Sequence, residues 1–253
     1  MISSSLFWHH YAKYWKAYPL IALFKFLGPA LQDGLNILDG YLDSAENLLV
    51  RAKEIAINGI NGSLSVEEMQ TLADEVAQLQ SELLDIANAQ VDGKYLFAGY
   101  AENTLPFSGS PTVYNGTNDH KLVEISAGQT VQTNLSGTEV FMAPVDLFAV
   151  LNDLETALGA GNGSAVAAEL NSLEVAAEQV RGKRSQMGNI NSHLDDVTDL
   201  TENIKLQMQE RLSRYEDADL VEVLTGITQA EQAFEAALSV SARVSKLSIL
   251  DYL

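Results

Sequence analysis

The sequence contains no cysteine, only five prolines and two tryptophans, and fewer than half as many basic as acidic residues. Without cysteine the chain can form no disulfide, no thiolate metal site and no thiol nucleophile, which excludes several classes of enzyme. With 15 Lys and Arg against 34 Asp and Glu, the formal charge of −19 has the wrong sign for a protein that coats phosphate backbones. We therefore do not expect nucleic acid as a partner.

Positive charge is concentrated at the start of the chain. The first acidic residue is Asp33 and three lysines precede it, so residues 1–32 carry +3 and the remainder carries −22. A signal peptide or a membrane-spanning helix is not expected, because Lys25 interrupts the apolar run and residues 20–27 fall short of the ~20 apolar residues that a span needs. An interfacial or disordered tail is the favoured interpretation.

The 253 residues suffice for one large domain or two ordinary ones, and helical periodicity begins at Leu31. Steps of three and four predict a helix with one buried stripe that ends near Asn58-Gly59. Ser65 and Glu68 have the spacing of a capping box, which predicts a second helix with its stop at Asp92-Gly93. The two predicted stripes consist of Leu31, Leu35, Leu38, Leu42, Ala45, Leu49, Ala52 and Ala56, and of Val66, Met69, Leu72, Val76, Leu79, Leu83 and Ile86.

The middle of the chain changes its period. Short runs rich in β-branched and aromatic residues alternate with glycines, which predicts a small antiparallel β module. The predicted strands are residues 95–97, 112–114, 122–125, 130–134 and 139–141.

Helical periodicity returns after Asp146. Residues 147–158 form a predicted short helix, residues 159–163 a glycine-rich loop, and Ser164 the predicted N-cap of a very long helical tract. Between residues 187 and 215 the apolar positions advance by an average of 3.5 residues, which favours a left-handed bundle or coiled coil. The predicted fold is therefore mainly α with a β insertion: a long antiparallel helical rod or coiled-coil bundle that carries a small antiparallel β module.

No set of residues predicts catalysis or metal binding. The four histidines, His9, His10, His120 and His193, are too scattered for zinc ligation, and surface positions are the expected reading. The acids near His193 (Asp195, Asp196 and Asp199) point in different directions on a helix. The loop 159–163 lacks the Lys-Ser/Thr of a phosphate loop. We expect no catalytic residue, no cofactor and no metal.

Two features remain unexplained by an isolated acidic domain. Arg181, Lys183 and Arg184 form the densest basic cluster after the first 32 residues, and pairing with acids on a bundle surface or at a subunit contact is more plausible than binding phosphate. The end of the chain, residues 247–253, is apolar and follows a tract with few charges. Such an apolar stripe usually means that a partner covers it.

The tract 48–56, followed by Asn58-Gly59 and by residues 61–65, resembles the rod helices of the bacterial flagellin superfamily. Further tracts resemble one family within it, the hook–filament junction proteins known as flagellar hook-associated protein 3. These tracts are 93–99 leading to Pro106-Phe107, 125–131 leading to 137–141, the helix signature 180–191, and the terminal segment 242–253.

The resemblance covers about residues 31–253 and implies a structural subunit without catalytic activity. Such a subunit would be exported by the flagellar type III apparatus and would assemble as an extracellular ring that joins hook to filament and is required for motility. Implied partners are hook-associated and filament subunits, further copies of the chain, and an export chaperone at the C-terminal helix, with no nucleic acid or small-molecule substrate. The implied assembly and chaperone surface consists of Phe234, Val244, Leu247, Ile249, Leu250 and Leu253.

The resemblance also implies a division of the chain into five segments. Residues 1–30 depart from the family pattern and form an atypical tail in place of its terminal helix, so residues 234–253 are expected to fray or self-associate in isolated protein. The other implied segments are N-terminal rod helices (31–93), a β-rich outer module (94–145), C-terminal rod helices (146–233) and a C-terminal assembly helix (234–253).

Three other interpretations remain. A filament flagellin shares the rod helices, but not the β module or the Leu-Asp-Tyr ending at residues 250–252. A membrane-tethered coiled-coil signalling or adhesive protein would use residues 17–31 as its anchor, against which Pro19 and Lys25 count. An enzyme is the weakest of the three, because no group of acid, base, nucleophile or metal ligand is found.

Overall fold

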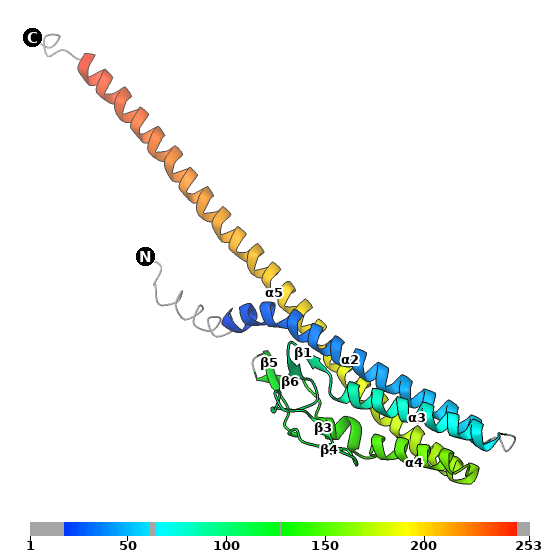
Figure 1. The fold of residues 1–253 in the computed structure, drawn as a ribbon. Coiled ribbons are helices and arrows are strands. Elements are labelled where there is room, and N and C mark those ends of the chain that lie inside the picture. Colours follow the sequence, from blue (N-terminus) through cyan, green and yellow to red (C-terminus); the bar gives the residue numbers. More distant parts are fainter. Residues whose placement is uncertain (1–17, 61–63, 127, 247–253) are drawn as a thin grey trace, which may run out of the picture. The chain divides into compact units, whose positions relative to one another are not determined.

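A computed structural model describes residues 18–60, 64–126 and 128–246, which are mainly helical (Figure 1). The chain divides into two compact units, residues 1–198 and residues 199–253. The last helix, α5 (Gly163–Lys246), contributes to both units. Within the described ranges, no helix combines the length and apolar character that crossing a membrane requires.

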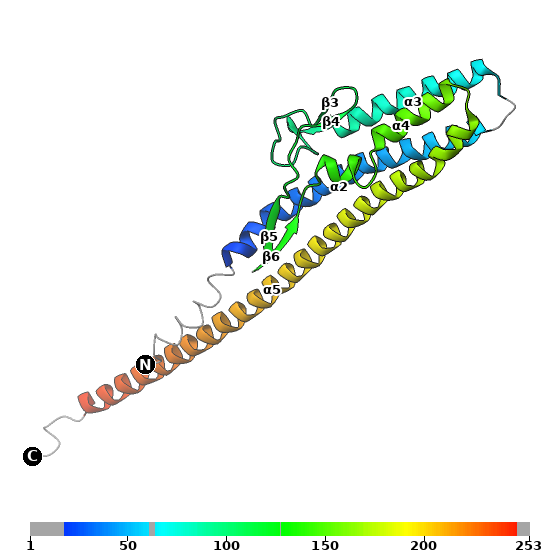
Figure 2. The same cartoon turned by 90° about the horizontal axis from the view of Figure 1, so that it is seen from below.

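The first unit is a helical bundle with a continuous apolar core. Helices α2 (Tyr18–Ile60), α3 (Val66–Ala87), α4 (Leu147–Gly159) and the first part of α5 lie lengthwise beside one another (Figures 1 and 2). The predicted α2 stripe is confirmed, since its members from Leu35 to Ala56 are buried. On α3 most of the stripe is buried, but Val66 is exposed because it occupies the first helical position.

Helix α2 begins earlier than predicted, at Tyr18 instead of Leu31. Residues 20–27 contain no helix breaker, and Pro29, which cannot donate a backbone hydrogen bond, lies inside α2 without ending it. Residues 1–17 of the predicted tail, and the predicted loop residues 61–63, lie outside the described residues.

The helix starts are fixed by side-chain caps. Ser65 and Glu68 form the predicted capping box of α3. Asp146 caps α4 by accepting hydrogen bonds from the N–H groups of Phe148 and Ala149. The predicted cap Ser164 is wrong: Asn162 Oδ1 accepts the hydrogen bond from Ala165 N (3.1 Å), because α5 begins at Gly163, two residues earlier than a cap at Ser164 implies.

Helices α3 and α4 pack closely against each other, and neither contains a lysine or arginine. Their apolar faces meet inside the bundle, while their outer faces are acidic. The acids of the pair are Glu67, Glu68, Asp74, Glu75, Glu82, Asp85, Asp153 and Glu155.

The β module lies between the end of α3 and the start of α4, and it is not one sheet. It contains three separate antiparallel pairs: β1 (Gln90–Val91) with β2 (Lys94–Tyr95), β3 (Phe107–Ser108) with β4 (Val113–Tyr114), and β5 (Leu122–Ser126) with β6 (Gln129–Gln132). Asp92-Gly93, the predicted stop of the second helix, instead forms the turn between β1 and β2, where both residues have positive φ. Helix α3 ends earlier, at Ala87.

The predicted strand 139–141 is wrong, because these residues lie in a π-helix, η1 (Thr138–Met142). Its apolar residues Val140 and Phe141 are buried together with Phe148 of α4. Phe141 meets Phe97 edge to face, with ring centroids 5.0 Å apart, and packs in the same way against Phe107 at 5.5 Å. Burial of this aromatic cluster, rather than strand pairing, explains the local conformation.

Side chains supply the backbone hydrogen bonds that short strands leave unmade. Asn88, after α3, bonds both N–H and C=O of Phe107 through its amide group. The Tyr114 hydroxyl donates to the carbonyl oxygens of Phe97 and Thr117, and burial raises the pKa of Tyr114. Gln179 of α5 donates to the carbonyl oxygens of Val140 (2.8 Å) and Val145 (3.2 Å) and accepts from Val145 N (3.0 Å). These buried polar groups fasten the module to the bundle.

Candidate functional site: a polar clasp and an exposed apolar helix

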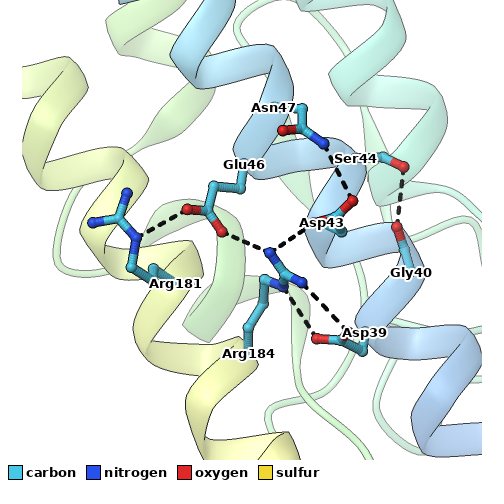
Figure 3. Close-up of polar contacts among 8 residues, drawn as sticks. All are labelled: Asp39, Gly40, Asp43, Ser44, Glu46, Asn47, Arg181 and Arg184. Carbon is cyan, nitrogen blue, oxygen red and sulfur yellow. Dashed lines mark hydrogen bonds and ion pairs between the residues drawn. The ribbon is translucent and has the colours of Figure 1, made fainter.

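Five charged residues join α2 to α5 on the bundle surface, and we call them the Arg184 clasp (Figure 3). Asp39, Asp43 and Glu46 are three or four residues apart and therefore share one face of α2. Arg184 of α5 reaches all three, with Nη1 2.7 Å from Asp43 Oδ1 and 2.9 Å from Glu46 Oε2, and Nε 3.1 Å from Asp39 Oδ1. Arg181 Nε donates to the other oxygen of Glu46 at 2.9 Å.

The clasp is partly screened from solvent, and Glu46 is its least exposed member, with 14% side-chain exposure. Burial acts to raise the pKa of Glu46, but hydrogen bonds from Arg184 and Arg181 outweigh burial and hold the pKa below its usual value. The carboxylates of Asp39 and Glu46 in turn raise the pKa of Arg184. The network therefore requires ionised carboxylates.

The expectation that Arg181, Lys183 and Arg184 pair with acids on a bundle surface is confirmed for all three residues. Lys183 Nζ lies 3.9 Å from Glu139 Oε2 of η1. The same carboxylate contacts His120 Nε2 at 3.2 Å, and His120 Nδ1 lies 2.8 Å from Gln132 Nε2. His120 is therefore half-buried in a polar network and is not the solvated surface histidine that was predicted, whereas His193 is exposed as predicted.

The second unit presents the opposite situation. Within the two stretches 199–214 and 221–244 of α5, no side chain is buried. Eleven large apolar residues there are each at least 50% exposed. We call them the exposed α5 residues: Leu200, Leu206, Leu212, Val221, Val223, Leu224, Ile227, Phe234, Leu238, Val240 and Val244.

This exposure corrects part of the predicted 3.5-residue stripe. Met187, Leu194 and Val197 are buried in the bundle, but the next positions are not, and Leu200 and Leu212 are 59% and 56% exposed. The apolar positions therefore continue along α5 beyond Val197, the last of them that is buried. An apolar surface of this extent on an isolated helix is typical of a protein–protein contact.

Two residues of the predicted assembly surface, Phe234 and Val244, lie on this exposed helix and are 65% and 62% exposed. The other four, Leu247, Ile249, Leu250 and Leu253, lie outside the described residues. Leu238 and Val240 were not predicted as part of this surface, although they are apolar residues close to Phe234 in the sequence, in a tract with few charges. The role of Gln179 was not predicted either, because no local motif signals it.

The described part of the chain contains no group of three or more His, Asp or Glu side chains able to hold a metal ion. Asp195, near His193 in the sequence, accepts a hydrogen bond from Gln32 Nε2 of α2 at 2.6 Å. Asp196 and Asp199 are exposed. The described residues thus provide an apolar surface for packing, on α5, and ion pairs that join α2 to α5.

Two family models match the chain, one at each end of the helical region. The model of the bacterial flagellin N-terminal helical region matches residues 30–102, and that of the bacterial flagellin C-terminal helical region matches residues 170–253. The second match contains all the exposed α5 residues and both arginines of the clasp.

A curated relative and two solved structures extend the likeness. Flagellar hook-associated protein 3 of Escherichia coli (strain K12) is 22% identical over 240 residues, which is 85% of this chain and 76% of the relative. A structure of flagellar hook-associated protein 3 from Legionella pneumophila matches with a TM-score of 0.70, at 18% identity, over 78% of this chain and 96% of that one. A putative flagellar hook-associated protein from Vibrio parahaemolyticus gives a TM-score of 0.70, at 22% identity, over 76% and 89% of the two chains.

Proposed function

The chain belongs to the bacterial flagellin superfamily, a family of structural and non-enzymatic proteins, and we propose that it is a junction subunit that joins the flagellar hook to the filament. It acts outside the cell, after export by the flagellar type III apparatus, and assembles as a ring of identical subunits that motility requires. The relationship to hook-associated protein 3 over 85% of the chain supports this role.

The observation that carries the proposal is the exposure of α5 beyond residue 198. Eleven large apolar side chains are exposed on a helix that has no buried residue among the stretches 199–214 and 221–244. Burying one such side chain contributes roughly 1.5–3 kcal/mol, so neighbouring subunits that cover several of them gain enough free energy to assemble. In the assembled junction this helix, including Phe234 and Val244, packs against other subunits.

The same surface explains the need for a partner before assembly. An exposed apolar helix is an aggregation hazard in a crowded compartment. We propose that an export chaperone covers the helix around Phe234 and Val244 until the subunit leaves the cell. The bundle of residues 31–198 then serves as the rigid body of the subunit, and the β module as its outer part.

Binding to isolated flagellar parts tests the proposal. The full chain is labelled and mixed with purified hooks and, separately, with filament fragments from the bacterium that encodes it, and bound protein is measured by sedimentation and electron microscopy. We expect label at hook ends. A chain that binds neither structure contradicts the proposal.

A matched pair of variants tests the surface itself. Phe234→Ser removes an exposed apolar side chain, whereas Gln232→Ser changes an exposed polar residue two positions away. We expect the first to weaken hook binding by about 10- to 100-fold and the second to leave it unchanged. Equal binding by both variants would show that this part of the helix is not the contact.

A filament flagellin is the second candidate, because both matching family models describe flagellin helical regions. The two roles differ in copy number and position. A filament subunit polymerises along the filament, whereas a junction subunit stops at the hook end. Continuous labelling of growing filaments would therefore favour the second candidate.

A further inference from the structure

We propose that residues 221–228 of α5, which we call the hinge segment, open in the free subunit and close when a partner covers the exposed α5 residues. Opening is a property of the isolated chain, whereas closing on a partner rests on the proposed function. The hinge segment would thereby regulate how tightly α5 binds.

The hinge segment is poor in residues that favour a helix. Six of its eight residues are β-branched or glycine: Val221, Val223, Thr225, Gly226, Ile227 and Thr228. Each of these residue types stabilises a helix less than alanine does, and glycine is the least favourable of them. Residues 229–240, which follow, contain four alanines, one β-branched residue and no glycine. The unfavourable sequence is therefore confined to about two turns of the helix.

Two threonine hydroxyls compete for the backbone hydrogen bonds of the hinge segment. Thr225 Oγ1 donates to the carbonyl oxygen of Val221 at 2.7 Å, and Thr228 Oγ1 donates to that of Leu224 at 2.9 Å. In an α-helix each of these oxygens is also the acceptor for the N–H of the same threonine. Sharing of this kind slightly destabilises a helix and often bends it. Both threonines lie within two residues of Gly226, so the weak points are concentrated in one place.

In the described part of the chain, tertiary packing supports residues 163–198 of α5 but not the hinge segment. Thr198 donates to the carbonyl oxygen of Leu194 at 2.8 Å in the same manner as Thr225 and Thr228, but Leu194 is buried against the bundle. Every residue of the hinge segment is exposed. Among the described residues beyond the adjoining helix backbone, no heavy atom lies within 4 Å of a Cβ added to Gly226. Its helical state therefore depends on local sequence alone, and we expect it to open before residues 229–240 do.

An open hinge segment divides the apolar surface of α5. Four of the exposed α5 residues lie within it, and four more, including Phe234 and Val244, follow it. A partner that packs along one face of the helix must hold both groups on a single continuous helix. Closing the segment therefore reduces the affinity for that partner, and a substitution that favours the closed state should increase the affinity.

Hydrogen exchange of the free full chain, followed by mass spectrometry, tests the opening. Relative to the rates of unstructured peptides, we expect residues 221–228 to exchange at least about tenfold faster than residues 229–240. Gly226→Ala should slow exchange in the hinge segment about fivefold, because alanine is the better helix former. The control Gly188→Ala also adds a methyl group in open space within α5, and it should leave the hinge segment unchanged. Equal protection of the two stretches, or an unchanged rate in Gly226→Ala, would overturn the proposal.

Binding to isolated hooks tests the closing. We expect Gly226→Ala to bind about three- to fivefold more tightly than wild type, and Gly188→Ala to bind as wild type does. A Gly226→Ala chain that exchanges more slowly but binds no more tightly would overturn the role of the hinge segment in binding. A wild-type chain that binds neither hooks nor filaments would instead contradict the proposed function, and hydrogen exchange would still decide whether the segment opens.

Discussion

The two halves of α5 show how one helix can serve two purposes. Between Gly163 and residue 198 the helix buries a regular set of side chains against the bundle: Val166, Leu173, Ala176, Ala177, Val180, Met187, Leu194 and Val197. Beyond residue 198, apolar residues recur with comparable frequency, and none of those described is buried. The first half stabilises the fold, and the second is available for association. Helical periodicity alone does not distinguish these two uses.

The largest expected contrast comes from the same substitution in each half. Leu173 is fully buried and Leu238 is 55% exposed, and both lie inside α5. Leu173→Ala should lower the free energy of unfolding of the bundle by about 2–5 kcal/mol, because it leaves a cavity. Leu238→Ala should change it by less than about 0.5 kcal/mol.

Urea unfolding followed by circular dichroism measures both effects, and alanine is compatible with a helix in both variants. If Leu238→Ala destabilised the isolated chain as much as Leu173→Ala does, Leu238 would already be packed in the monomer. The comparison between the two halves of α5 would then fail.

Loss of the Gln179 amide should have the next largest effect. Gln179→Leu removes three hydrogen bonds and leaves the backbone groups of Val140 and Val145 without these partners, at a cost of about 3 kcal/mol. Hydrogen exchange should increase in η1 and the β module more than in α3. The control, Glu178→Leu, alters the exposed neighbouring position. If hydrogen exchange in the Gln179 variant did not increase more in η1 and the β module than in α3, the aromatic cluster alone would hold the module on the bundle.

Removal of the charge at the centre of the clasp is expected to cost less. Arg184→Met keeps most of the apolar stem but leaves Glu46 with only Arg181 as a partner, so stability should fall by about 2 kcal/mol. The same change at Arg211, an exposed residue in the second half of α5, should have almost no effect on chemical unfolding. A similar loss in both variants would mean that the clasp adds nothing specific.

The smallest of these effects is the pH dependence of the clasp. The folded protein holds the pKa of Glu46 below its unfolded value of 4.5, so the ionised carboxylate stabilises the bundle above that pH. This contribution should be lost as the pH falls through the lowered pKa. Glu46→Gln should therefore flatten the decline of the unfolding midpoint in acid. An identical decline in wild type and variant would remove Glu46 as a contributor.

The helices could be predicted from the sequence because their signals are local. The stripe from Leu35 to Ala56 and the capping box at Ser65 both repeat or pair within one or two turns, and the structure confirms them. The π-helix could not be predicted in this way, because residues 139–141 are β-prone by composition. Their conformation depends on Phe97, Phe107 and Gln179, which are distant in the sequence.

The candidate site likewise has features that could be predicted from the sequence and others that only the fold reveals. Pairing of Arg181, Lys183 and Arg184 with acids followed from charge balance, but only the fold identifies the partners. Those of the two arginines, Asp39, Asp43 and Glu46, are more than a hundred residues away. Exposure of Phe234 and Val244 could be predicted because both lie in a tract with few charges that leads to the apolar residues 247–253. The point at which burial stops, after Val197, depends on where the neighbouring helices end.

The absence of basic residues from α3 and α4 also bears on how the bundle responds to its medium. Eight acids lie on two helices that pack together. Glu75 pairs with Arg51 of α2 (Nη2 to Oε1 2.6 Å), and the mutual repulsion of the other seven opposes folding when few ions are present. Salt shortens the range of this repulsion from about 30 Å at 0.01 M to about 10 Å at 0.1 M, while the partly buried pairs of the clasp are screened less. The urea midpoint of the bundle should therefore rise with the concentration of sodium chloride. Dissolved cations would then screen the carboxylates that no basic residue of α3 or α4 balances.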